Sequence, residues 1–279
     1  MEKYIIDKIK LLGDTIYHYT SLNTLINILK SKEFWLFSTA QMNDKLEQKY
    51  FIEDLQQKIK QQISEDSFEK CDSIFNKIYK RLDFEYPYAM CFSLLEDDAS
   101  QWERYSNNGM GVRIGFNTEN IVKLFCNGYS NLTKISYGFD SSQHAHFNVL
   151  KKYIVEEEIT EGFSNERQII DNVLACSTMH KHIGFQTEQE CRITTFWGHF
   201  LMKNSTCDFV VIRDVARRVL KVKVDQMCAE QKINFEDLFE SVLLGPKSVQ
   251  NEIELRAYLK TLGYNNLAEN THKSKCPLR

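Results

Sequence analysis

The stretch Tyr17-His18-Tyr19-Thr20 decides the fold, because aromatic and β-branched residues of this kind favour a β-strand. Ser21 follows it as an N-cap, and apolar residues then recur at helical spacing over residues 22–29. Residues 33–38 are rich in aromatic residues and indicate a second strand. The chain is therefore expected to open with a strand, a short amphipathic helix and another strand.

The rest of the chain mixes charged helices with short apolar strands. Residues 44–80 are helical in pattern and strongly charged, which indicates an inserted helical hairpin with a solvated face. Further strands are expected at 86–93, 111–116, 133–137, 191–197, 208–212, 219–224 and 241–244, and helices at 118–125, 147–158, 166–181 and 249–262. Because few regular strand–helix–strand units occur, the order predicts an α+β fold.

No linker divides the chain. Its 279 residues are 43% hydrophobic, enough to bury a substantial core, and include only 3 prolines and 11 glycines. We therefore expect a single domain over residues 1–264, followed by a loosely held polar tail over residues 265–279.

Charge and composition limit the function classes. The formal net charge of -3 gives no global reason to expect binding to nucleic acid or an anionic membrane, although a local basic groove is compatible with it. No apolar run approaches the roughly 18 residues of a membrane span, so a cytoplasmic protein without membrane contact is expected.

The 8 cysteines form no C-x-x-C pair, and the histidine pairs at 144/146 and 180/182 lack further ligands at metal spacing. No metal site is predicted.

The opening strands carry the first candidate site. His18 and Thr20 lie on one face of the first strand, and Trp35 and Phe37 lie on the second. This arrangement predicts a small polar site walled by aromatic rings. The alternative is that His18 is a hydrogen-bonded core histidine and the aromatic residues fill the core.

The second candidate is the stretch Glu188-Gln189-Glu190-Cys191-Arg192, whose charged residues alternate at the start of a strand. One interpretation is a surface salt bridge between Glu190 and Arg192, which would contribute only about 0–1 kcal/mol. The functional alternative is that a carboxylate binds a sugar hydroxyl and stabilises positive charge developing at the anomeric carbon.

A third group of residues is less specific. Trp102 and Tyr105 are spaced for packing on one helix face, and Arg113 could meet a phosphate or simply be solvated. Ser93 lacks the Gly-x-Ser-x-Gly context of a hydrolase nucleophile, and the chain has no P-loop or Rossmann glycine motif. Asn43 either binds a ligand or caps the next helix.

Several blocks together resemble a bacterial family, the domain of unknown function numbered 2971, over roughly residues 15–247. The blocks are Tyr17–Thr20, 25–29, 34–38, 42–44, 91–93, Gln101-Trp102 with Tyr105, 111–116, Lys181-His182, 188–192 and Leu244-Gly245.

The opening also resembles ADP-ribosyltransferase-fold enzymes, including DNA-modifying toxins and RNA 2'-phosphotransferases. That resemblance implies a split, mixed or antiparallel β-sheet core with the helical insertion near residues 44–80, and NAD as co-substrate. It implies that His18 and Thr20 bind NAD, that Trp35 or Phe37 stacks on nicotinamide, and that Glu190 is catalytic while Glu188 positions the acceptor. The expected catalytic set is His18, Glu188 and Glu190, and the expected cofactor-binding set is His18, Tyr19, Thr20, Trp35, Phe37, Ser38, Asn43, Ser93 and Arg113.

The function implied by this resemblance is an NAD-dependent ADP-ribosyltransferase, a bacterial toxin or anti-phage defence effector that modifies RNA or DNA. An antitoxin would then be a partner. Three alternatives stay open: transfer to a protein, hydrolysis of NAD, and nucleotide binding without catalysis.

Overall fold

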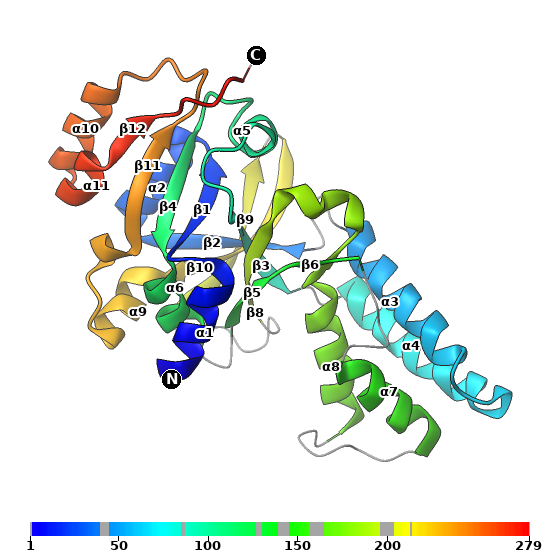
Figure 1. Ribbon diagram of the computed structural model, residues 1–279. Helices are drawn as coiled ribbons and strands as arrows, with labels where there is room; N and C mark the ends of the chain where they lie inside the picture. The colour runs from blue at the N-terminus through cyan, green and yellow to red at the C-terminus, as the bar shows by residue number, and fades with distance from the viewer. Residues whose placement is uncertain are drawn as a thin grey trace.

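The protein is described by a computed structural model covering residues 2–39, 45–84, 87–126, 130–138, 145–156, 165–195, 204–212 and 214–278 (Figure 1). The predicted ligand residue Asn43 and the end of the strand expected at 191–197 lie outside these residues. The helices are α1 (Glu2–Leu12), α2 (Leu22–Ser31), α3 (Lys45–Lys60), α4 (Phe68–Phe84), α5 (Ala99–Tyr105), α6 (Thr118–Phe125), α7 (Ala145–Glu156), α8 (Glu166–Ser177), α9 (Val224–Gln231), α10 (Glu252–Thr261) and α11 (Asn265–Glu269), with 3₁₀ helices η2 (Glu65–Ser67), η4 (Ile183–Glu188) and η5 (Phe235–Leu238).

The strands confirm an α+β fold with a mixed, largely antiparallel sheet. Among the described residues ten strands form one sheet, ordered β12-β11-β4-β1-β3-β2-β10-β9, with β8 pairing β3 and β5 pairing β8. Among the strands that the structure describes, β11 and β12 pair in parallel within this sheet, and β6 and β7 form a separate parallel pair. The strands are β1 (Thr15–Thr20), β2 (Glu33–Ser38), β3 (Tyr88–Ser93), β4 (Val112–Asn117), β5 (Ser130–Lys134), β6 (Ser136–Tyr137), β7 (His180–Lys181), β8 (Glu190–Thr195), β9 (Ser205–Ile212), β10 (Val215–Lys223), β11 (Phe239–Leu244) and β12 (Thr271–Lys273).

The expected strand–helix–strand opening is confirmed as β1, α2 and β2. Ser21 caps α2 through its hydroxyl, which accepts a hydrogen bond of 3.1 Å from the Thr24 amide. Leu25, Ile28 and Leu29 form the buried face of that helix. The opening unit therefore contributes buried residues from both strands and from the helix to the main core.

Strand β3 is where the sheet splits. One edge of β3 pairs with β8 along its length, from Ala89 to Ser93. The other edge pairs with β1 only at Ser93, and with β2 only at Tyr88 and Ala89. Strands β1 and β2 therefore diverge along the same edge of β3, on either side of Cys91.

The main core is built from aromatic contacts between the sheet and its helices. Phe34 on β2 meets Phe116 on β4 edge-on at 5.5 Å, and stacks on Phe125 of α6 at 5.9 Å between ring centroids. Apolar side chains of α1, α2, α6, α9, α10 and α11 complete this cluster. The helices α1 and α9 were not expected from the sequence.

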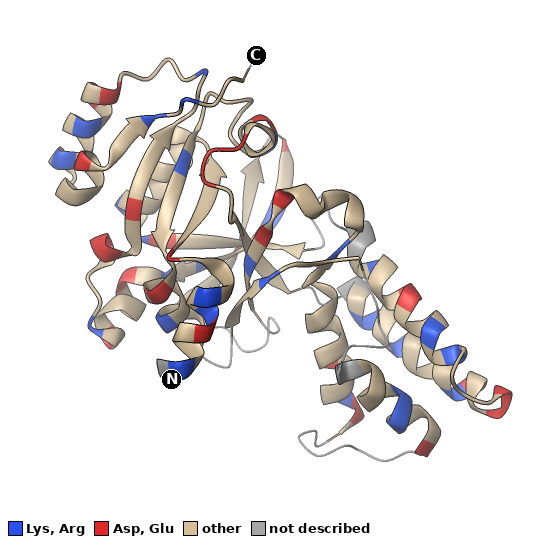
Figure 2. Cartoon of the chain, viewed as in Figure 1, with Lys and Arg blue, Asp and Glu red and all other residues tan. Residues whose placement is uncertain are grey.

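A second hydrophobic core holds a helical bundle that projects from the sheet (Figure 1). Helices α3 and α4 form the expected hairpin, and α7 and α8 pack against it. Charged residues lie along α3 and α4 (Figure 2). Helices α7 and α8 add apolar side chains to those of α3 and α4 and complete this second core.

Two segments differ from the expectation. The helix expected over 166–181 ends at Ser177, and β7 follows it and pairs with β6. The expected polar tail instead contains α11 and β12, with Leu267 and Ala268 buried. The tail contains too few apolar residues to form a pattern that would have predicted this packing.

Phe75 tests whether the bundle has its own close-packed core. The side chain is fully buried among the helices, so Phe75→Ala should lower the free energy of unfolding by about 3–5 kcal/mol in a urea titration. Ile253→Ala, at a side chain that is 74% exposed, should change it by no more than about 0.5 kcal/mol. A Phe75→Ala effect as small as that of the control would contradict this packing.

Candidate functional site

A cavity of about 230 Å³ lies at the split of the sheet. Its walls include His18 from β1, Phe37 from β2 and Ser93 from β3, together with Glu188 and Glu190 before and at the start of β8. Pockets for drug-sized ligands are roughly 300–1,000 Å³, so this cavity suits one end of a larger ligand. Strands β1, β2 and β8 each pair with β3, so β3 brings these residues together.

His18 is fixed in one tautomer by the split. Its Nδ1 lies 2.8 Å from the carbonyl oxygen of Cys91, between the β3 residues that pair with β1 and with β2. Because a carbonyl only accepts, Nδ1 carries the proton and Nε2 is left as an acceptor. Burial lowers the pKa of His18, and the hydrogen bond to Cys91 opposes this only in part. The imidazole is therefore neutral at pH 7.

The second strand resolves which aromatic residue faces the cavity. Phe37 lines it, whereas Trp35 is not among the described residues that do. The Trp35 ring instead lies 4.9 Å from the Lys221 ammonium, and its indole N–H donates to Glu33 at 3.3 Å. Phe37 is therefore the candidate stacking residue.

Three other predicted residues of the opening have separate positions. Tyr19 lines the cavity, and its hydroxyl donates to the Leu95 carbonyl at 2.9 Å, so it also holds the loop after β3. Thr20 pairs with Val112, and Ser38 is buried against Tyr88. Neither Thr20 nor Ser38 is among the described lining residues.

Ser93 and Arg113 are held by internal contacts. The Ser93 hydroxyl donates to the Glu188 carbonyl at 2.9 Å and accepts from the Leu95 amide at 3.1 Å. Arg113 is buried, donates to the Ser241 hydroxyl at 2.7 Å and lies over the Tyr17 ring at 4.7 Å. It is not among the described lining residues. Ser93 therefore positions the glutamate segment, and Arg113 supports the cavity wall from behind.

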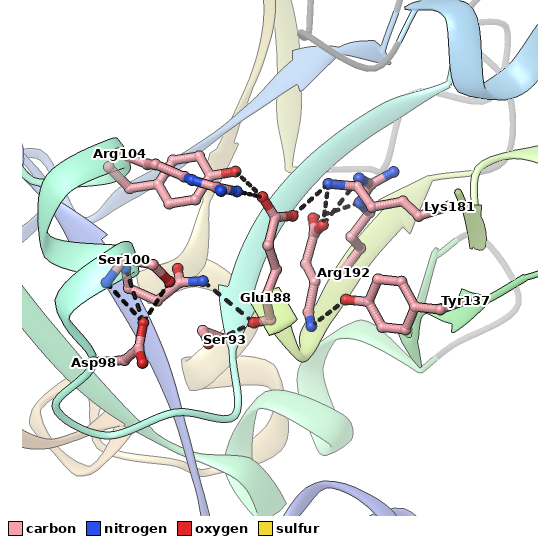
Figure 3. Close-up of polar contacts among 11 residues, drawn as sticks. Ser93, Asp98, Ser100, Arg104, Tyr137, Lys181, Glu188 and Arg192 are labelled. Carbon is pink, nitrogen blue, oxygen red and sulfur yellow. Dashed lines mark hydrogen bonds and ion pairs between the residues drawn. The ribbon is translucent and has the colours of Figure 1, made fainter. Parts of the chain in front are cut away.

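The two glutamates belong to a buried network of charges (Figure 3). Glu188 accepts hydrogen bonds on Oε1 from Arg104 at 2.8 Å and from the Tyr105 hydroxyl at 2.9 Å. Lys181 Nζ lies 2.8 Å from Oε2 of each glutamate. Arg192 binds Glu190 through Nε at 2.6 Å and Nη2 at 3.1 Å.

The structure corrects the interpretation that Glu190 and Arg192 form a salt bridge at the surface. The side chains are only 8% and 3% exposed, so the ion pair is buried rather than solvated. Burial alone would raise the pKa of Glu190, but the Arg192 guanidinium and the Lys181 ammonium outweigh it and lower the pKa to about 2. Glu190 is therefore ionised at neutral pH.

Sequence reasoning missed several residues of this network. Lys181 was expected inside a helix, and Tyr105 was expected to pack, whereas both line the cavity. Arg104 and Tyr105 come from the helix α5, which the Asp98 side chain caps. The Tyr137 hydroxyl accepts a hydrogen bond of 2.7 Å from the Glu190 amide. In the sequence Arg192 lies two residues after Glu190, but Arg104 and Tyr105 lie 84 and 83 residues before Glu188, so no local pattern pointed to them.

Comparison with known families gives one match. Residues 101–193 match a family described as a protein of unknown function (DUF2971). That stretch contains most of α5, all of β7 and both glutamates, whereas β1, α2 and β2 lie outside it. No curated protein and no solved structure matches the chain. The match supports the predicted domain-of-unknown-function family over about a third of the chain.

Two further features concern metals and membranes. Among the described residues no group of three or more His, Cys, Asp or Glu side chains could hold a metal ion. His180 instead donates from Nδ1 to the Cys176 carbonyl at 2.8 Å, and His144 lies outside the described residues. None of the described helices is long and apolar enough to cross a membrane.

The pH dependence of stability tests the state of His18. Because folding lowers its pKa, the unfolded chain binds a proton below about pH 6.5 that the folded chain does not. Stability should therefore fall as the pH drops through 6.5 to 5, and His18→Gln should flatten this fall in denaturant titrations. The exposed His272→Gln is the control and should keep the wild-type slope. An unchanged slope in His18→Gln would contradict an imidazole that the fold keeps neutral.

Proposed function

We propose that this chain is an NAD-dependent ADP-ribosyltransferase whose cavity holds the nicotinamide ribose of NAD. One observation carries the proposal: His18 and Glu190, to which the enzyme resemblance gives the NAD-binding and catalytic roles, line one cavity. They come from strands β1 and β8, which do not pair with each other. Glu188 lines the same cavity.

The reaction needs a carboxylate beside the sugar. The bond between C1' of the ribose and the nicotinamide nitrogen breaks, and neutral nicotinamide leaves with the bonding electrons. Positive charge then develops on the ribose, where an ionised carboxylate stabilises it. The acceptor attacks C1' and loses a proton to solvent, which completes the transfer.

The residues present suit these roles. His18 Nε2 is an acceptor for a ribose hydroxyl, because its Nδ1 proton is given to the Cys91 carbonyl. Phe37 offers a ring for stacking against nicotinamide. Glu190 is ionised and held rigidly by Arg192. A cavity of about 230 Å³ would hold only the nicotinamide end of NAD and leave the adenosine end outside.

The acceptor is proposed to be RNA or DNA, and the biological role that of a bacterial toxin or defence effector restrained by an antitoxin. The resemblance to nucleic-acid-modifying toxins supports this choice. Transfer to a protein and hydrolysis of NAD are the alternatives that the same cavity chemistry allows.

A second candidate function is nucleotide binding without turnover. It is favoured by the charges around the cavity, where Arg104, Lys181 and Arg192 accompany only two glutamates. Such an excess of positive charge attracts phosphate groups and opposes the development of positive charge on a sugar.

Nicotinamide release tests the enzymatic proposal. The wild-type chain incubated with NAD and total RNA, DNA or lysate should release nicotinamide and label an acceptor. Glu190→Gln should reduce release by at least about a hundredfold, because it removes the charge that stabilises the developing cation. Melting curves of each variant establish that it is folded.

Glu166→Gln is the matched control for this variant. Glu166 also binds a lysine and a tyrosine, Lys77 at 2.7 Å and Tyr153 at 3.0 Å, but it lies in the helical bundle. Its substitution should leave release unchanged. Absence of both nicotinamide release and acceptor labelling with folded wild-type protein would rule out the transferase proposal.

Ligand-dependent melting distinguishes the second candidate. Saturating NAD should raise the melting temperature of the wild-type chain under either function, because a ligand that binds only the folded state stabilises it. Under the binding function this rise would occur without nicotinamide release. Phe37→Ala should reduce the rise, whereas Trp35→Ala should reduce it less. The reverse order would show that Phe37 is not the stacking residue.

A further inference from the structure

Lys181 is the one cation in the described network that contacts both glutamates. Its Nζ lies 2.8 Å from Glu188 Oε2 and 2.8 Å from Glu190 Oε2. Arg104 binds only Glu188 within this pair, and Arg192 binds only Glu190. The ammonium group therefore links the carboxylate of Glu188, at the end of the 3₁₀ helix η4, to that of Glu190, at the start of β8.

Two carboxylates at one buried site normally repel each other, so that one of them gains a proton or moves away. Here the glutamate side chains are 4% and 8% exposed, and that of Lys181 is 3% exposed. Water therefore does little to screen the two negative charges. An ammonium group between them removes the repulsion and has three N–H donors to offer.

The helical bundle fixes the position of Lys181. Its neighbours in the chain both contact α3: His180 packs on Phe51 at 4.5 Å, and His182 meets Tyr50 edge-on at 5.8 Å between ring centroids. Successive side chains of an extended segment point to opposite sides. Lys181 is therefore directed away from α3 and into the cavity wall.

We propose that Lys181 is a positioning residue, set in place by the helical bundle, that holds Glu188 and Glu190 side by side at the cavity. Its effect on turnover rests on the proposed transferase function, but its effect on the carboxylates does not. The two predicted glutamates then act as a unit only while the ammonium is present. None of the described lining residues comes from the bundle helices, so the bundle becomes part of the site through β7.

Other charged or titratable groups also face the glutamate pair and are kept constant in the test. They come from β1, β3, α5, β6, β8 and β10, and they are His18, Cys91, Arg104, Tyr105, Tyr137, Arg192 and Arg217.

The experiment compares Lys181→Met and Lys181→Arg with the wild-type chain. Glu190 contributes stability that is present above its unfolded pKa and is lost as the pH falls toward its folded pKa of about 2. Without the ammonium the folded pKa of Glu190 should rise toward its unfolded value, so Glu190 contributes less stability. The acid-unfolding midpoint of Lys181→Met should therefore rise by about one pH unit or more. Under the transferase proposal, nicotinamide release should fall by at least about a hundredfold, because the carboxylates lose their fixed positions beside the sugar and this outweighs the removal of one opposing positive charge. Lys181→Arg keeps the charge and should recover part of both effects.

Lys8→Met is the matched control. Lys8 is a half-buried lysine on α1 whose ammonium donates to the Leu132 carbonyl, away from the cavity. It should keep the wild-type acid midpoint and nicotinamide release. A Lys181→Met variant that behaves like this control would overturn the proposal. If wild-type protein releases no nicotinamide, the transferase function fails, while the acid midpoints still decide the role of Lys181.

A double variant covers the case in which Lys181→Met does not fold. Adding Glu188→Gln removes one of the two negative charges. If repulsion between the carboxylates causes the failure, the double variant should fold again and show strong non-additivity. If it stays unfolded, the lysine acts only by packing and the proposal is overturned.

Discussion

The structure depends on the pairing of β3, which has β8 along one edge and both β1 and β2 along the other. Because β8 occupies one edge, β1 and β2 must share the other, and they diverge around Cys91. The divergence leaves a gap between β1 and β2 in the sheet, and the cavity lies at this gap. It also brings the opening strands of the chain to the glutamates at the start of β8. The His18 side chain takes the Cys91 carbonyl as its partner there, so the same constraint orients the imidazole.

The buried charges follow from that arrangement. An isolated buried ion pair is a weak source of stability, because removing two charges from water offsets most of their attraction. Here each glutamate binds an arginine and both bind Lys181, so the partners hold the carboxylates in fixed positions. Such a network is better suited to positioning groups at a cavity than to stabilising the fold. That is the physical reason for regarding the cavity as functional.

Local sequence patterns predicted the helices and strands, but not which of them come together around the cavity. The β1–α2–β2 opening and the hairpin at 44–80 were found because their apolar spacing is set by neighbours in the chain. His18 and Glu190 were predicted as site residues, and both line the cavity. Lys181, Tyr105 and the choice of Phe37 over Trp35 were missed, because they depend on register and packing between distant segments. The packed residues after 264 were missed because α11 and β12 are very short.

A crystal structure of the protein with NAD tests the central claim most directly. The account predicts that the nicotinamide ribose lies in the cavity, with His18 Nε2 and a carboxylate oxygen of Glu190 or Glu188 each about 3 Å from a ribose hydroxyl. The nicotinamide ring should lie against Phe37. NAD bound elsewhere on the protein, or oriented with its adenine in the cavity and its ribose away from both glutamates, would contradict the account.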